Sequence, residues 1–383
     1  GAAMMRPAAL LCRTILLFPL PVLAQDEVPP QASTSTVVVE SPRRRQTVAK
    51  LATIATEAME GVDRLAALDE LSRTEPRSFD DLRLLLDLFT RGEPRARQAA
   101  EESLGRLPRE AQSFGPFFNN LLLDSDPFFQ TFGMIGAYRL RYAPALSLIR
   151  ALASKPFKSP PPGPSMVPQE ANRWHSQFQA LRVLALWEGK EALPLMAKKA
   201  KEAPSVASLM AQLLWEDSLD TIVSWSESSR ARAKDCAKAA WSADPPREAL
   251  LRTAPALRKL LLDRRKELHT RHAAALKLGK VLDDAGVSDL IGARGGTTDD
   301  KTRLLLEAAI FASANPRAVP LLEDHVRQNP APEGRAGALL QLRGMLPSER
   351  YLALLQWVAQ NDKDDENRRN ALRELKGDGQ TQP

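Results

Sequence analysis

Apolar and polar positions follow a helical period through residues 300–329, DKTRLLLEAAIFASANPRAVPLLEDHVRQN. In the first half, apolar residues share one helix face at i, i+3 and i+7, namely Leu305, Ala308 and Ala312. Asn315-Pro316 interrupts the pattern, because proline cannot continue the backbone hydrogen bonds of a helix. The second half repeats the same spacing with Val319, Leu322 and Val326. The segment therefore predicts two helices folded into a hairpin.

Such a hairpin cannot bury its apolar face alone, so it needs similar hairpins as neighbours. Equivalent starts of the second helix recur at steps close to 32 residues, at Phe79, Ala111, Ala143, Ala192, Val287, Ala318 and Arg350. The step after Ala143 is longer by about 17 residues, and the step after Ala192 spans about three periods, with starts near Leu219 and Ala254. We therefore predict an all-α fold, a right-handed α-solenoid of helical hairpins over residues 47–375.

Two of these hairpins resemble a known family. LGRLPREA at 104–111 and ANPRAVPLL at 314–322 are similar to short HEAT-type repeats, also called lyase-like HEAT repeats, and the resemblance covers most of residues 47–375. It implies an α-solenoid, and members of the family serve as scaffolds, adaptors, lyases or DNA-binding enzymes. The family places an acidic residue before the proline of the inter-helix turn, whereas this chain has Asn315 there, so the repeat count stays open.

The first residues have the pattern of an export signal. Residues 1–24 predict a secretory signal peptide, in which we set residues 1–3 aside as a cloning remnant. Arg6 and Arg13 supply the positive start, and the apolar run 14–23 is too short to span a bilayer. The alternative, a buried N-terminal helix, is disfavoured by the two prolines in that run. We expect a periplasmic or secreted protein.

Composition changes this picture little. Residues 25–46 and 376–383 are polar, and we expect them to form a disordered leader and a disordered tail. No later apolar run approaches the length of a transmembrane helix, so no such helix is expected in the mature chain.

A net charge of +6 is modest for 383 residues and argues against nucleic acid as a partner. Cys236 alone follows the signal peptide, so we expect a buried free thiol and no internal disulfide.

A proline-rich insertion lies at 155–169, KPFKSPPPGPSMVPQ, where prolines forbid a regular helix and favour an extended conformation. Insertions in helical repeats emerge on one face, which is often the binding face. The alternative is an ordinary surface loop. If the insertion binds, its candidate residues, with the aromatic residue that opens the next helix, are Phe157, Pro160, Pro161, Pro162, Met166 and Trp174.

Phenylalanines crowd into residues 114–132, where six of the chain's 12 are found. We favour a locally bulky core, since aromatic residues at helical spacing usually pack inward. The alternative is an exposed apolar patch that binds a partner. Its candidates are Phe117, Phe118, Phe128 and Phe129. Asp126-Pro127 predicts the start of a helix there.

The most basic stretch is RKLLLDRRKELHTRH at 258–272, which we expect to be helical. Its candidate basic face consists of Arg258, Lys259, Arg264, Arg265, Lys266 and Arg271. Such a face could attract an acidic partner, an anionic lipid surface or an acidic polysaccharide. We favour a solvated helix face instead, because Asp263 and Glu267 interrupt the positive field.

Chemical motifs are weak throughout. His269 and His272 share a helix face but lack a third metal ligand at a suitable spacing. Asp362, Asp364 and Glu366 imitate the start of a calcium loop without its later glycine and glutamate. Glycines at 292, 295 and 296 match no phosphate loop, and we expect them to end a helix and its repeat. No nucleophile–base set stands out, so we expect no metal, no cofactor and no catalytic residue.

The sequence thus favours an exported, non-enzymatic interaction scaffold that binds a protein partner of unknown identity. Two alternatives remain: a binder of an anionic macromolecule or surface through the basic stretch, and an enzyme of the lyase-like HEAT kind. Affinity that falls steeply with salt would favour the anionic partner. A protein partner recovered by pull-down from the exported fraction would favour the scaffold.

Overall fold

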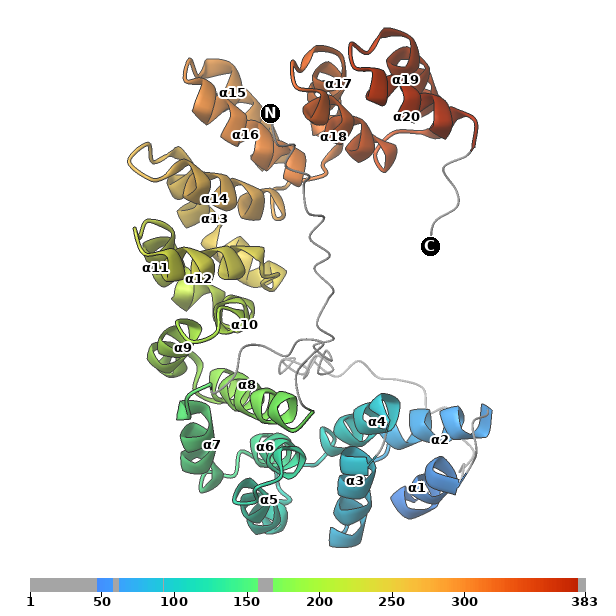
Figure 1. Cartoon of the computed structure of the whole chain (residues 1–383), viewed down its shortest axis with the longest axis vertical. Helices are drawn as coiled ribbons and strands as arrows, with labels where there is room; N and C mark the ends of the chain where they lie inside the picture. The colour runs from blue at the N-terminus through green and yellow to red at the C-terminus, as the bar shows by residue number, and fades with distance from the viewer. Residues whose placement is uncertain (1–46, 58–61, 92, 158–167, 378–383) are drawn as a thin grey trace, which may run out of the picture. The chain divides into compact units, whose positions relative to one another are not determined.

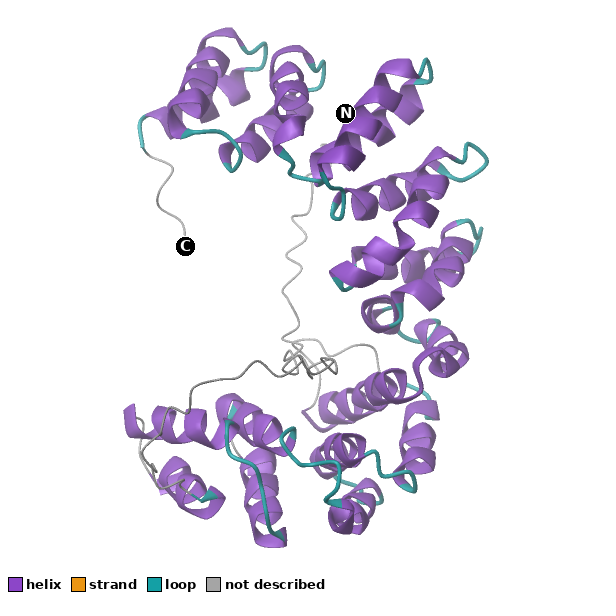
Figure 2. Ribbon diagram, turned by 180° about the vertical axis from the view of Figure 1, so that it is seen from behind, coloured by secondary structure: helices purple, strands orange, loops and turns teal. Residues whose placement is uncertain are grey.

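The computed structural model describes residues 47–57, 62–91, 93–157 and 168–377. Within these ranges the regular structure is helical and no strand occurs, which confirms the all-α class (Figure 2). The chain divides into two compact units, unit 1 up to Ala192 and unit 2 from Leu193 onward. The signal peptide, the leader and the last residues of the tail, all predicted from the sequence, lie outside the described ranges.

Unit 1 is built from helices joined by short loops (Figure 1). They are α1 (Val48–Glu57), α2 (Val62–Ser72), α3 (Phe79–Arg91), α4 (Pro94–Leu104), α5 (Gly115–Leu122), α6 (Pro127–Leu140), α7 (Ala145–Ser154) and α8 (Pro168–Glu188). Consecutive helices pack in pairs, and α2, α4, α6 and α8 also contact one another in series. The core between the pairs includes Leu82, Leu85, Leu104 and Phe132, all nearly inaccessible to solvent.

The α5–α6 pair is the most closely packed part of unit 1. Asp126 caps α6 by accepting a hydrogen bond from the Phe128 N–H, as the sequence predicts. Gly133 and Gly136 face α5, and a Cβ at Gly136 would lie only 2.3 Å from the ring of Phe118. The missing side chains let the two helices approach around this ring.

Unit 2 continues the paired arrangement (Figure 1). Its helices are α9 (Leu193–Ala200), α10 (Ser205–Leu213), α11 (Trp215–Ser226), α12 (Ala231–Ser242), α13 (Arg247–Leu262), α14 (Leu268–Gly279), α15 (Asp284–Gly296), α16 (Asp300–Ala312), α17 (Val319–Gln328), α18 (Pro332–Arg343), α19 (Ser348–Asn361) and α20 (Asp365–Leu375). Cys236 is a fully buried free thiol in α12, as expected.

Both helices predicted at 300–329 are present, as α16 and α17. They do not form the predicted hairpin, because α16 pairs with α15 and α17 pairs with α18. The helices that the sequence pattern assigns as second helices are therefore the first helices of the observed pairs. Asn315 ends the turn by accepting a hydrogen bond from the Arg317 N–H, and a short 3-10 turn, Pro316–Ala318, leads into α17. The predicted face of α17 is buried, at Val319, Leu322 and Val326. The face of α16 is rotated from the prediction, because Leu306, Ala309 and Ile310 are buried while Ala308 and Ala312 are half-buried.

Side-chain donors join successive second helices of the pairs. In unit 1, Arg106 Nε donates to Ser72 O at 2.7 Å and Arg139 Nε donates to Leu107 O at 2.8 Å. In unit 2, Lys277 donates to Ala243 O, and Gln341 donates to Phe311 O. These carbonyls lie at or just beyond helix C-termini, where helical backbone leaves acceptors unpaired. Each donor thus binds a carbonyl at the end of the preceding second helix, about one repeat earlier in the sequence. Phe311 O accepts from the Ala314 N–H as well.

One sequence prediction about a helix boundary is wrong. Ala254 does not start a helix, because α13 begins at Arg247 and carries Pro255 in its interior on the exposed side. The glycines predicted to end a helix do so at Gly295 and Gly296, the last two residues of α15. Gly292 lies inside α15, where burial of Val287 and Leu290 on the same helix outweighs the low helix propensity of glycine, about 1 kcal/mol per residue. No helix in the described ranges is long and apolar enough to cross a membrane.

Candidate functional site

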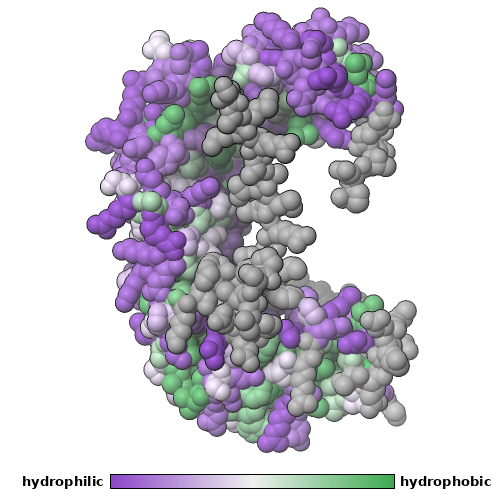
Figure 3. Space-filling view, viewed as in Figure 1, coloured by the Kyte–Doolittle hydropathy of each residue, from purple (hydrophilic) through white to green (hydrophobic). Residues whose placement is uncertain are grey.

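An open groove in unit 1 is formed by the end of α5, the start of α6, and helices α7 and α8. Its volume is about 830 Å³. The lining residues are Leu122, Leu123, Asp124, Ser125, Pro127, Gln130, Leu148, Ala151, Leu152, Lys155, Pro156, Arg173, Trp174 and Gln177. Hydrophobic residues gather around α5, α6 and α7 on the face shown in Figure 3. The groove is therefore a mainly apolar recess on an accessible surface.

Aromatic rings support one wall of the groove. Trp174 is only 3% exposed and stacks on Phe178, with ring centroids 5.0 Å apart. Phe157 is half-buried, and its ring centroid lies 5.7 Å from that of Trp174. The structure thus brings together two of the predicted partner-binding residues, Phe157 and Trp174. The other members of that set, Pro160, Pro161, Pro162 and Met166, lie outside the described ranges.

The polar groups around the groove are mostly paired with one another. Gln130 donates to Asp124 O at 2.7 Å and accepts from Ser176 Oγ at 2.9 Å. Gln177 donates to Pro156 O at 3.2 Å. The Trp174 indole is an exception, because its buried Nε1–H has no hydrogen-bond acceptor among the residues that the structure describes. A buried donor without a partner carries a free-energy penalty of about 1–3 kcal/mol.

Two side chains at the groove are open to solvent. Leu123, just after α5, is 65% exposed, the kind of apolar group that a binding partner can cover. Arg173, in the first half of α8, is exposed and makes no ion pair with any residue of the described ranges. The groove can therefore offer apolar contact together with a positive charge.

The phenylalanine cluster forms core rather than an exposed patch. Phe118 is fully buried and packs against Phe117 and Phe132, so it is not available to a partner. Phe117 and Phe129 are half-buried. Phe128 is half-buried beneath the guanidinium of Arg97, at 4.5 Å from the ring centroid. None of these predicted candidates is an exposed aromatic side chain.

The basic stretch is not one helix. Arg258 and Lys259 end α13, Arg264, Arg265 and Lys266 lie in the following turn, and Arg271 lies in α14. Arg271 is 4% exposed and donates to Leu261 O and Thr302 Oγ1, so it cannot contribute to a surface charge.

Carboxylates accompany the exposed arginines of this stretch. Arg265 pairs with Asp263 at 2.9 Å, while Arg258 and Arg264 lie 3.8 Å from Asp289 and Asp299. Lys259 is exposed and Lys266 is half-buried. Opposite charges at these distances weaken the positive field that an anionic partner would need.

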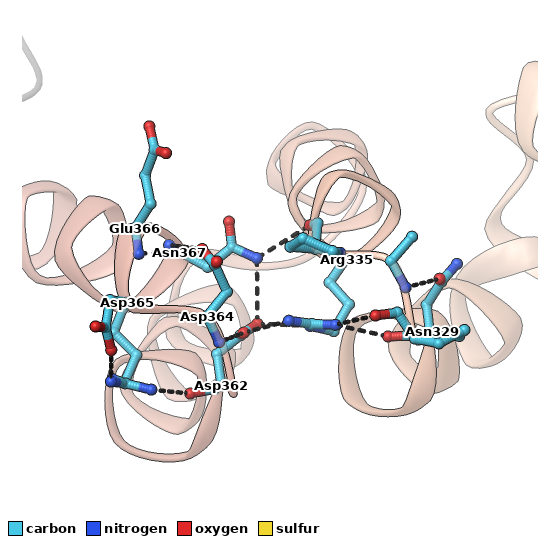
Figure 4. A network of polar contacts seen from close by, with 11 residues as sticks. Asn329, Arg335, Asp362, Asp364, Asp365, Glu366 and Asn367 are labelled. Atoms are coloured by element: carbon cyan, nitrogen blue, oxygen red, sulfur yellow. Dashed lines mark hydrogen bonds and ion pairs between the residues drawn. The ribbon is translucent and has the colours of Figure 1, made fainter. Parts of the chain in front are cut away.

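The residues that resembled metal-binding motifs in the sequence make other interactions in the structure. His269 Nε2 lies 3.0 Å from Ser226 O, and no group of three potential metal ligands occurs in the described part of the chain. Asp362 forms a buried ion pair with Arg335, in which the two guanidinium nitrogens donate at 3.0 and 2.7 Å (Figure 4). Asp364 caps α20 by accepting from the backbone N–H groups of Glu366 and Asn367.

A polar cluster that the sequence did not reveal lies on α4 and α8. Burial raises the pKa of Glu101 to about 7, although the nearby charge of Arg182 opposes the shift. Three buried atoms of this cluster have no hydrogen-bond partner in the described part of the chain, namely Glu101 Oε1, Arg97 Nε and Arg182 Nε. Burial also lowers the pKa values of both arginines. Nothing in the local sequence distinguishes these residues from ordinary helix-surface charges.

Comparison with known proteins assigns no family to the chain: no family model matches it, and no curated protein matches it significantly. The groove itself is therefore the basis for a functional interpretation. An apolar recess that offers the unpaired Trp174 N–H and the exposed charge of Arg173 can bind an apolar segment. The described residues around it show no nucleophile–base pair.

Proposed function

We propose that this chain is an exported, non-enzymatic interaction scaffold that binds a protein partner through the groove of unit 1. In this proposal the paired helices belong to a right-handed, HEAT-like α-solenoid. Pairs that repeat at about 32 residues, and donors that connect successive second helices, support that arrangement. The observation that carries the binding function is the open groove of about 830 Å³ with the exposed Leu123 at its edge.

Site-specific photo-crosslinking tests the proposal. A photoreactive amino acid replaces Arg173 in the groove, and in a control it replaces Leu352, a 45% exposed residue of α19 in unit 2. The protein is irradiated in its producing cells. We expect a crosslinked species of one defined mass from position 173 and none from position 352, since a binding groove contacts a specific partner.

A groove-filling substitution separates specific binding from chance contact. Ala151 is exposed on α7 and lines the groove, so Ala151→Trp occupies the recess without entering the core. We expect the crosslink from position 173 to disappear in this background while helix content stays unchanged. Equal crosslinking at both positions, or a crosslink that survives Ala151→Trp, would contradict a scaffold that binds through this groove.

A further inference from the structure

We propose that the groove of unit 1 takes an extended, proline-containing segment of the partner protein, and that a backbone carbonyl of this segment accepts a hydrogen bond from the Trp174 indole. This inference rests on the proposed scaffold function and specifies the chemistry of the partner. It is carried by the unpaired, buried Nε1–H of a residue that lines the groove.

Within the described residues this donor has no acceptor. Three acceptors of the lining already take other donors: Asp124 O accepts from Gln130, Pro156 O accepts from Gln177, and the Asp124 carboxylate accepts from the Asp126 N–H at 2.8 Å. An incoming ligand that supplies an acceptor gains a hydrogen bond worth about 1 kcal/mol and removes the penalty of the unpaired group.

The backbone conformation of the ligand follows from what the groove offers. The groove walls come from helices α5 to α8, whose backbone groups are bonded within the helices, so they present no strand edge for β-addition. A helical ligand has its own carbonyls bonded internally as well. An extended polyproline-type segment keeps its carbonyls free and loses little conformational entropy on binding.

The lining favours proline rings and an acidic neighbour. The 65% exposed Leu123 and the half-buried Leu148 provide branched apolar surface on which pyrrolidine rings pack. Arg173 contributes the open charge at the same groove. An aspartate or glutamate next to the prolines would pair with this guanidinium and set the direction of the bound segment.

The indole nitrogen is inaccessible in the free chain, so the ligand reaches it only with a local rearrangement of the groove wall around Trp174. Binding should therefore change the environment of Trp174 and leave the other tryptophans of the chain unaffected. The chain has 6 tryptophans in total, so their indole signals can be distinguished by NMR.

The test records indole ¹H–¹⁵N signals of the full chain during titration with a peptide of six prolines followed by an aspartate. A control peptide carries alanines in place of the prolines. Trp174→Phe identifies the signal of Trp174. We expect the proline peptide to shift this signal downfield, as hydrogen bonding to a carbonyl does, and the alanine peptide to bind at least about tenfold more weakly.

Two variants at exposed positions complete the experiment. If Trp174→Phe does not fold, the indole signal that changes in the Ala151→Arg variant, and not in the Leu352→Arg variant, is assigned to Trp174. Ala151→Arg should weaken binding of the proline peptide by about tenfold or more, and Leu352→Arg in unit 2 should leave it unchanged. Binding without a shift at Trp174, equal binding of both peptides, or equal binding by the Ala151→Arg variant overturns the inference. If neither peptide binds while the position-173 crosslink forms, the partner chemistry is wrong and the scaffold function stands.

Discussion

The Glu101 carboxyl makes the stability of unit 1 depend on pH. Its folded-state pKa of about 7 lies above the ordinary value of 4.5, so the folded chain binds more protons than the unfolded chain between these values. Stability attributable to this group therefore falls as pH rises from about 4.5 to about 7. We expect Glu101→Gln to stabilise the protein by about 1–3 kcal/mol at pH 8 and to have little effect at pH 4.

Urea denaturation at the two pH values checks this expectation. Glu110→Gln serves as the control, because Glu110 is an exposed carboxylate of unit 1 whose charge is not among those that shift the pKa of Glu101. Equal effects of Glu101→Gln at both pH values would show that the carboxyl is hydrated in the folded chain.

The Arg335–Asp362 pair is a different kind of buried charge. Its side chains are only 7% and 1% exposed, and Arg335 also donates to Asn329 O at 2.8 Å (Figure 4). Removing one partner leaves the other charge buried and unpaired, so Arg335→Met should destabilise unit 2 by about 3–5 kcal/mol.

The exposed pair between Arg350 and Glu323 provides the comparison. Arg350 is 55% exposed, and Arg350→Met should change the free energy of unfolding by less than about 1 kcal/mol. The two variants are compared by the denaturant midpoint of unit 2, followed with the indole NMR signal of Trp357. Similar midpoints would mean that Arg335 contributes no more than a surface ion pair.

At the scale of elements, the close approach of α5 and α6 requires glycine. A Cβ at Gly136 would clash with the Phe118 ring, whereas a Cβ at Gly337 on α18 would meet nothing within 4 Å. We expect Gly136→Ala to destabilise the protein by about 1–3 kcal/mol through overpacking. Gly337→Ala should stabilise it by about 0.5–1 kcal/mol through helix propensity. Thermal unfolding of both variants measures the contrast, and a Gly136→Ala variant as stable as the wild type would contradict it.

The elements also show what the sequence could and could not predict. Pro316 and the face of Val319, Leu322 and Val326 follow from local rules, and both were predicted correctly. The burial of Arg271 was not predicted, because it depends on where α13 ends and on the position of Thr302 in another hairpin. The groove combines residues from four helices, so among its lining residues only Trp174 was predicted by number to bind a partner. Lys155 and Pro156 were predicted only as part of the proline-rich insertion.

At the scale of the molecule, stability should be local. The stronger helix contacts within each unit join helices at most three apart in order. In such an array a defect spreads mainly to neighbouring repeats. Hydrogen exchange of Gly136→Ala should therefore rise across α3 to α8 and remain unchanged across α17 to α20. A uniform rise along the whole chain would instead show a single cooperative fold.

The donors that connect successive second helices imply a rule for changing the length of the chain. Arg106 donates a hydrogen bond to a carbonyl of the preceding helix pair, Ser72 O. Arg139, one pair further along the chain, donates in the same way to Leu107 O. Excising or duplicating one complete hairpin leaves each donor with an equivalent carbonyl. Excising part of a hairpin leaves a guanidinium donor without an acceptor and a carbonyl at a helix end without a donor. Insertions and deletions that natural variants tolerate should thus come in whole hairpins.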